Sequence, residues 1–188
     1  GLVKKISLYN FKNFHKNGII IINLLNNDQL IDVKITTNSD EIILVSNFGK
    51  ILRFKTNEIR PTGRLSKGII GIRLNKDEHI VSTLIIKNKS YIFTITSNGF
   101  GKLTKVKDYP KKKRGKKGLI GINFNNKMGE ITNAISINLN DNLLLTTVNG
   151  IMLKMNINDV SCTSRNTKGV ILIHLNKNDK LTNINILN

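Results

Sequence analysis

KGIIGIRL, at residues 67–74, is one of four related octapeptides in this chain. The others are NGIIIINL at 17–24, KGLIGINF at 117–124 and KGVILIHL at 168–175. Each places a glycine directly before a run that is mostly apolar. Four such copies in a chain without helical periodicity are typical of an array whose units bury their apolar faces against one another.

The stretches ahead of these octapeptides repeat in step with them. They begin at Gly1, Gly49, Gly99 and Gly150, which are 48, 50 and 51 residues apart. The whole chain is therefore predicted to be a single repeat domain, residues 1–188. Its units are expected at approximately 1–48, 49–98, 99–149 and 150–188.

Short β-branched runs bounded by turn residues predict strands in every copy. Examples are LVKKISL (2–8), IIIINL (19–24), LIDVKIT (30–36), EIILVSN (41–47), KILRFKT (50–56), IIGIRL (69–74), IVSTLII (80–86) and YIFTITS (91–97). We count four strands in each of the first three copies and three in the last, with the N-terminus a candidate to supply the missing one. Four-stranded units suit an all-β circular array of blades, a β-propeller or a β-pinwheel. These two differ in how neighbouring blades share strands, which periodicity does not resolve.

The charge of the chain is strongly positive. Thirty Lys and Arg against 12 Asp and Glu give a formal net charge of +18. Such a field attracts an extended polyanion, nucleic acid first and an anionic membrane surface second. The alternative is an AT-rich bacterial genome whose codons raise Lys, Asn and Ile everywhere. Clustering of the charge, rather than its total, decides between these interpretations.

The charge gathers in one polar connection per copy. These connections are NFKNFHKN (10–17), NEIRPTGRLSK (57–67), KDYPKKKRGKK (107–117) and NDVSCTSRNTK (158–168). Arg four residues and Lys one residue before the glycine recur in the last three, which a solvated loop face made basic by codon usage does not explain. Equivalent loops of a circular array share one rim, where their cations can neutralise phosphates. The predicted DNA-binding residues are Lys12, Lys16, Arg64, Lys67, Lys111, Lys112, Lys113, Arg114, Lys116, Lys117, Arg165 and Lys168.

A second set of basic residues follows the opening glycine of each copy: Lys4, Lys5, Arg53, Lys102 and Lys154. Strand alternation is expected to point these side chains outward. They either extend the same basic track or protect strand edges from pairing.

The sequence predicts neither catalysis nor a bound metal. His15, His79 and His174 are scattered, and Cys162 is the only cysteine, so no zinc or Cys-His pattern exists. One cysteine and no disulfide framework fit a reducing cytoplasm. The longest apolar run, Ile19–Ile22, is too short to span a membrane, and no signal peptide is visible. We expect the chain to be a fragment of something longer.

Sequence-specific DNA recognition is not expected. The chain has no evident recognition helix and no aromatic pair that would stack on unpaired bases. Contact with the phosphate backbone combined with DNA bending is the physical mode of wrapping proteins.

The chain resembles the C-terminal domain of the DNA gyrase A subunit, through GLVKKISLYNF, NFGKILRFKTNEIRPTG, NGFGKLTKVKDYP and SRNTKGVILI. The resemblance implies a β-pinwheel that wraps double-stranded DNA around a basic perimeter. It also implies the remainder of gyrase A and the whole of gyrase B as partners, a place at the nucleoid, and ATP and Mg²⁺ acting elsewhere in the parent enzyme. No cofactor is expected in this chain.

Departures from the family pattern limit what the resemblance implies. The nearest counterpart of the family's basic box (Gln-Arg-Arg-Gly-Gly-Lys-Gly) is 112–118, but it lies in the third copy, where a late blade is expected. We therefore interpret it as a basic loop and place the true box outside this chain. Family domains have six blades, so four copies imply a truncated or reduced domain, either a small ring or an open arc.

Two other functions remain open from the sequence. One is the corresponding DNA-capture domain of topoisomerase IV, which lacks the box. The other is a propeller-type scaffold whose basic loops bind an acidic protein.

Overall fold

The computed structural model describes residues 1–12, 17–88, 90–125 and 127–187. Within these ranges the chain forms strands and short 3-10 helices only, and no helix is long and apolar enough to cross a membrane. The elements are β1 (Leu2–Val3), η1 (Leu8–Phe11), β2 (Glu41–Ser46), β3 (Lys50–Lys55), η2 (Thr56–Glu58), β4 (Ile69–Ile70), β5 (Ile80–Ile86), β6 (Tyr91–Thr96), β7 (Phe100–Lys105), η3 (Val106–Asp108), β8 (Leu119–Ile120), β9 (Ile131–Ile137), β10 (Asn142–Thr147), β11 (Met152–Asn156), η4 (Ile157–Asp159), β12 (Val170–Ile171) and β13 (Leu181–Leu187). The all-β prediction is confirmed.

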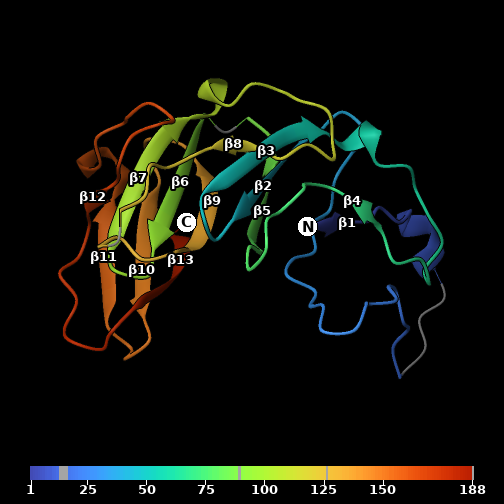
Figure 1. The fold of residues 1–188 in the computed structure, drawn as a ribbon, viewed down its shortest axis with the longest axis horizontal. Helices are drawn as coiled ribbons and strands as arrows, with labels where there is room; N and C mark the ends of the chain where they lie inside the picture. Colours follow the sequence, from blue (N-terminus) through green and yellow to red (C-terminus); the bar gives the residue numbers. More distant parts are fainter. Residues whose placement is uncertain (13–16, 89, 126, 188) are drawn as a thin grey trace.

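The strands form four sheets, which we number as blades in chain order. Blade 1 is β1-β4, blade 2 is β5-β2-β3-β8, blade 3 is β12-β7-β6-β9 and blade 4 is β11-β10-β13. Figure 1 shows them following one another along an arc, with the N-terminus at one end and β11 at the other.

The outermost strand of a blade comes from the next copy along the chain. After the β6–β7 hairpin of blade 3, the chain crosses to blade 2, where β8 pairs with β3 in the register Lys50↔Ile120. It then returns to blade 3 as β9. In the same way β12 leaves blade 4 and pairs with β7, Phe100 opposite Ile171. This exchange of strands between neighbours is that of a β-pinwheel.

The first copy departs from the predicted pattern. Residues 19–24 and 30–36 form no strand, so the prediction of four strands there is wrong. The innermost strands β5 and β9 pair with β2 and β6, which precede the turn glycines Gly49 and Gly99. In the first copy the corresponding turn glycine is Gly1, and among the described residues no strand pairs with 30–36.

The last copy contains three strands, as counted from the sequence, but its blade is not completed by the N-terminus. Within the described ranges β11 pairs only with β10. The N-terminus lies at the far end of the arc (Figure 1).

Apolar faces of successive blades pack together to form the core. Phe93 and Leu103 of blade 3 lie in one buried cluster with Leu143 and Leu145 of blade 4. Burial of one such side chain contributes about 2 kcal/mol. The turns fit this packing closely. Gly49 has φ +76, and a Cβ added there would meet the Phe124 ring.

Candidate nucleic-acid interface

Three basic connections start from a buried anchor. The second (57–67), third (107–117) and fourth (158–168) connections each begin within a 3-10 turn, η2, η3 and η4 respectively. The residue that ends each turn, Ile59, Tyr109 or Val160, is at most 4% exposed. Burial raises the pKa of Tyr109 to about 12. Each connection is therefore fixed to the core before it reaches the surface.

Backbone hydrogen bonds join the third and fourth connections to the segments that follow the second and third connections. The Gly115 N–H donates to Gly71 O (2.6 Å) and the Arg73 N–H to Lys116 O (2.9 Å), which links the third connection to the segment after β4. The Asn123 N–H donates to Thr167 O (3.0 Å), which links the fourth connection to the segment after β8. We call these three connections, with β4, β8 and β12, the perimeter belt.

Two arginine side chains reinforce these links. Arg114 donates from its guanidinium to Ile70 O at 2.7 Å, and Arg165 donates to Ile120 O at 2.5 Å. Glu58 also holds Arg114, because its carboxylate accepts from the Arg114 backbone N–H at 2.9 Å. Both arginines are half-buried. They position the loops in addition to carrying charge.

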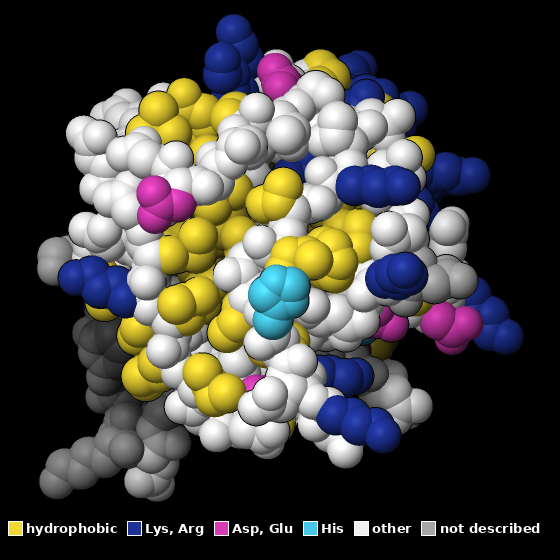
Figure 2. Space-filling view, turned by 90° about the vertical axis from the view of Figure 1, so that its left-hand side faces the viewer, with side chains coloured by type: hydrophobic (Ala, Val, Ile, Leu, Met, Phe, Trp, Pro, Cys, Tyr) yellow, Lys and Arg dark blue, Asp and Glu magenta, His cyan; other side chains and the backbone are white. Residues whose placement is uncertain are grey.

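Most of the predicted basic residues of the belt are exposed. The exposed ones are Arg64, Lys67, Lys111, Lys112, Lys113, Lys116, Lys117 and Lys168. The third connection carries the densest charge. Figure 2 views the side of the molecule where β11 and β12 lie, and shows Lys and Arg mainly along its top and right margins, beside a hydrophobic area.

The first connection contributes less to this surface. Lys12 is exposed, and its ammonium group lies 3.6 Å from the centre of the Tyr9 ring. Lys16 lies outside the described residues. Among the described residues, no backbone hydrogen bond joins residues 17–24 to the second connection, so the belt's backbone links end at β4.

The prediction that the second set of basic residues points outward is wrong for Lys102 and Lys4. Lys102 is 2% exposed, and its Nζ donates to the carbonyl oxygens of Gly121 (2.9 Å), Thr167 (3.1 Å) and Arg165. Burial lowers the pKa of Lys102 to about 8, the Arg165 charge acts in the same direction, and Asp108 opposes it.

Register explains this error. Lys4 and Lys102 both lie three residues after the opening glycine, whereas Lys5, Arg53 and Lys154 lie four residues after it. Adjacent strand positions face opposite sides, so these five residues do not form one row. The sequence alone contains this signal once the glycines are aligned.

Of the residues in the outward register, only Lys154 is exposed. Arg53 donates to Val106 O (2.9 Å) and Tyr109 O (3.1 Å) and pairs with Glu41. Lys5 donates to Thr56 O at 2.9 Å. Burial would raise the pKa of Glu41, but hydrogen bonds and charge from Lys111 and Arg53 outweigh it and lower that pKa.

Exposed cations on or beside the belt that are missing from the predicted set include Arg60, Lys107 and Arg73. Arg60 and Lys107 lie in the second and third connections, at offsets that do not recur in every copy. Arg73 comes beside Lys116 through pairing between repeats, which the sequence does not reveal.

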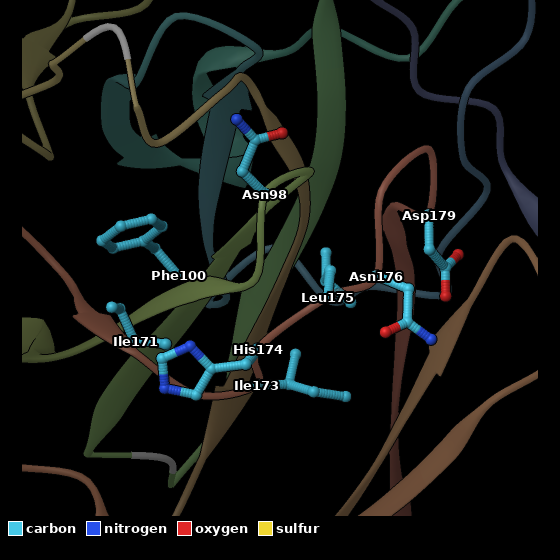
Figure 3. A pocket seen from close by; sticks show the side chains of 8 residues that line it. All are labelled: Asn98, Phe100, Ile171, Ile173, His174, Leu175, Asn176 and Asp179. Atoms are coloured by element: carbon cyan, nitrogen blue, oxygen red, sulfur yellow. The ribbon is translucent and has the colours of Figure 1, made fainter.

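A hollow of about 350 Å³ lies between β7 and the segment after β12. Figure 3 shows Phe100, Ile171 and His174 on one side of it and Asn176 and Asp179 on the other. Its lining contains no Lys or Arg, so it adds nothing to the basic surface. Among the described residues, no group of three or more His, Cys, Asp or Glu could hold a metal ion.

Comparison with protein families gives one match that recurs four times. The family described as the DNA gyrase C-terminal domain, beta-propeller, matches residues 1–37, 40–87, 90–138 and 141–188.

Curated relatives show the same similarity. The DNA gyrase A subunit of Buchnera aphidicola is 58% identical over 181 residues, and that of Clostridium acetobutylicum is 42% identical over 181 residues. Both alignments cover 96% of this chain and 22% of the relative. The chain thus spans about a fifth of the length of these proteins.

Solved structures agree in fold. The chain is similar to a DNA gyrase A C-terminal domain with TM-score 0.85 and 26% identity, over 91% of this chain and 58% of the other. It is similar to the C-terminal domain of DNA topoisomerase IV with TM-score 0.93 and 25% identity, over 100% of this chain and 59% of the other.

Proposed function

Because the chain belongs to the DNA gyrase C-terminal domain family, we propose that it binds and wraps double-stranded DNA along the perimeter belt. The parent enzyme would be an ATP-dependent type II topoisomerase, with the remainder of gyrase A and the whole of gyrase B as partners at the bacterial nucleoid. This chain supplies no catalytic residue, and ATP and Mg²⁺ act elsewhere in that enzyme.

The continuity of the belt is the observation that carries the proposal. The third and fourth basic connections are each hydrogen-bonded to the segment that follows the preceding connection, so the cations of all three connections lie on one linked track rather than on separate loops. A duplex that follows such a track is bent, and the added phosphate contacts offset the cost of bending. Its recognition rests on the backbone and shape of DNA, not on base sequence.

Salt dependence tests this proposal. If about six to ten phosphates are neutralised, affinity for a duplex falls by roughly 10³ to 10⁵ between 50 and 200 mM salt. Fluorescence anisotropy on two duplexes of unrelated sequence measures both the slope and the sequence preference. Binding that ignores salt, or that strongly prefers one duplex, would contradict the proposal.

A second candidate follows from the fit to the topoisomerase IV domain. In this alternative the chain captures a DNA segment without wrapping it. Ligation of nicked circles with the protein bound separates the two functions. A shift in linking number supports wrapping, whereas binding with unchanged topology supports capture.

A further inference from the structure

Two connections of the perimeter belt have an ammonium group directly behind them. In the fourth connection, the carbonyl oxygens of Arg165 and Thr167 both accept from Nζ of the buried Lys102. The third acceptor is Gly121 O. An ammonium group has three N–H donors, and all three are used within the protein. Lys102 therefore touches no ligand, but it fixes the direction of two peptide groups.

The same arrangement occurs in the second connection. Nζ of Lys4 donates to Ser66 O at 3.0 Å, to Ile21 O at 2.8 Å and to Arg64 O. Lys4 and Lys102 occupy the same position relative to the opening glycine, as do the carbonyl groups they hold relative to Lys-Gly. Recurrence at equivalent positions indicates a feature of the repeat rather than an isolated contact.

Peptide geometry then sets where the neighbouring N–H groups point. The chain contains no cis peptide bond among the described residues, and a trans peptide directs its C=O and N–H to opposite sides. Since the carbonyls of Arg165 and Thr167 point inward, the N–H groups of Asn166 and Lys168 point outward.

The equivalent outward N–H groups in the second connection belong to Leu65 and Lys67. These two residues, with Asn166 and Lys168, are exposed. Within the described part of the chain, none of the four N–H groups has a hydrogen-bond partner.

Outward backbone N–H groups beside a lysine side chain are the elements of an anion site. We propose that the N–H groups of Asn166 and Lys168, and those of Leu65 and Lys67, each bind a DNA phosphate, with Lys102 and Lys4 as the positioning residues. This inference rests on the proposed DNA binding and specifies part of its chemistry. The ammonium group, buried in Lys102 and half-buried in Lys4, adds positive charge behind each site and polarises the peptides toward stronger donation.

The third connection lacks this arrangement. Leu52 stands at the position of Lys102, and the Gly115 N–H is already bonded to Gly71 O. Its phosphate contacts therefore come from side chains. The belt would thus alternate between backbone sites at its two ends and a cluster of lysines in its middle.

Amide NMR on the full chain tests the sites directly. Titration with inorganic phosphate, and separately with a short duplex, should move the amide proton signals of Asn166, Lys168, Leu65 and Lys67 downfield. Lack of movement at all four while the duplex binds would overturn the backbone sites and leave DNA binding standing. Failure of the duplex to bind at all would instead contradict the proposed function.

A matched pair of variants tests the positioning residue. Lys102→Leu introduces the residue that the second copy carries at this position, and Lys105→Leu removes an exposed charge from the same strand. We expect Lys102→Leu to weaken duplex binding by about tenfold or more, since a hydrogen bond to a charged group contributes at least that factor. We also expect it to abolish the phosphate-induced shifts at Asn166 and Lys168, while those at Leu65 and Lys67 remain.

Lys105→Leu should keep all four shifts. Equal effects of the two variants on the Asn166 and Lys168 shifts would overturn the role of Lys102. If Lys102→Leu fails to fold, the wild-type titration alone still decides whether the backbone sites exist.

Discussion

The ammonium group of Lys50 lies 2.7 Å from Oε2 of Glu78, whose side chain has no exposed surface. The other carboxylate oxygen accepts from the Ser46 hydroxyl at 2.6 Å, and Oε2 also accepts from the Asn75 N–H. These contacts tie the β2–β3 hairpin to the chain segment that returns to the same blade as β5.

This cluster predicts acid sensitivity. Burial alone would raise the pKa of Glu78, but the Asn75 N–H, Lys50 and Ser46 outweigh it and hold the pKa below its ordinary value of 4.5. A carboxyl whose pKa is lower in the folded state stabilises the protein above its unfolded pKa, and this stabilisation is lost as pH falls through the folded value. Glu78→Gln should therefore lower the free energy of unfolding by about 2 kcal/mol at pH 7.

The difference between wild type and Glu78→Gln should stay constant from pH 7 to pH 5 and shrink below the ordinary value of 4.5. Urea unfolding at several pH values measures it. Glu130→Gln, at an exposed carboxylate, is the control and should cost much less. A difference that does not depend on pH would argue against the ion pair.

Single lysines of the third connection should change the salt dependence of DNA binding. Lys112→Ala and Lys113→Ala are each expected to weaken binding on all sequences alike and to reduce the slope of log K against log salt by about 1. Lys127→Ala removes the same charge outside the belt and should leave the slope unchanged. Equal slopes for all three variants would place the DNA elsewhere.

Cys162 offers a footprint on the fourth connection. It is an exposed free thiol between the belt's anchor Val160 and Arg165. Duplex DNA at saturating concentration should slow its alkylation by iodoacetamide, since the DNA would cover the loop. High salt should restore the free rate because it releases the DNA. If bound DNA does not change the alkylation rate, the fourth connection lies outside the DNA interface.

Alanine substitutions at two turn glycines distinguish the stability cost of backbone strain from the cost of overpacking. Gly150 has φ +83 with open space around it, so Gly150→Ala should cost about 1–2 kcal/mol from the left-handed conformation alone. A Cβ on Gly49 would also meet the Phe124 ring and, at 2.6 Å, Ile122. Gly49→Ala should therefore cost about 2 kcal/mol more, as overpacking does. Denaturant unfolding of both variants measures the difference. Equal losses of unfolding free energy would show that packing of the Gly49 turn against Phe124 and Ile122 does not contribute to stability.

The local sequence pattern predicts the hairpins, because the two strands of a hairpin are adjacent in sequence. The hairpins β2–β3 and β6–β7 follow from β-branched runs around Phe48-Gly49 and Asn98-Gly99. The failure of 30–36 to form a strand could not be predicted from its own residues, because its apolar alternation resembles that of β5. In the second copy the equivalent segment, β5, forms a strand because it pairs with β2. Residues 30–36 would need an equivalent partner strand.

The candidate site was predictable in outline but not in orientation. The recurring Arg and Lys offsets located the perimeter belt, and most of its lysines are exposed. The inward direction of Lys102 was not predicted, because three carbonyl groups from two different copies compensate its burial. Such compensation depends on contacts between residues up to 65 positions apart.

The exchange of strands also determines how a pull on the surface is transmitted. The third connection runs from η3, which follows blade 3, to β8, which belongs to the sheet of blade 2. Tension applied by a bent duplex to this connection therefore loads two sheets at once. The elastic recoil of a bent duplex would therefore be shared between these two sheets rather than carried by one.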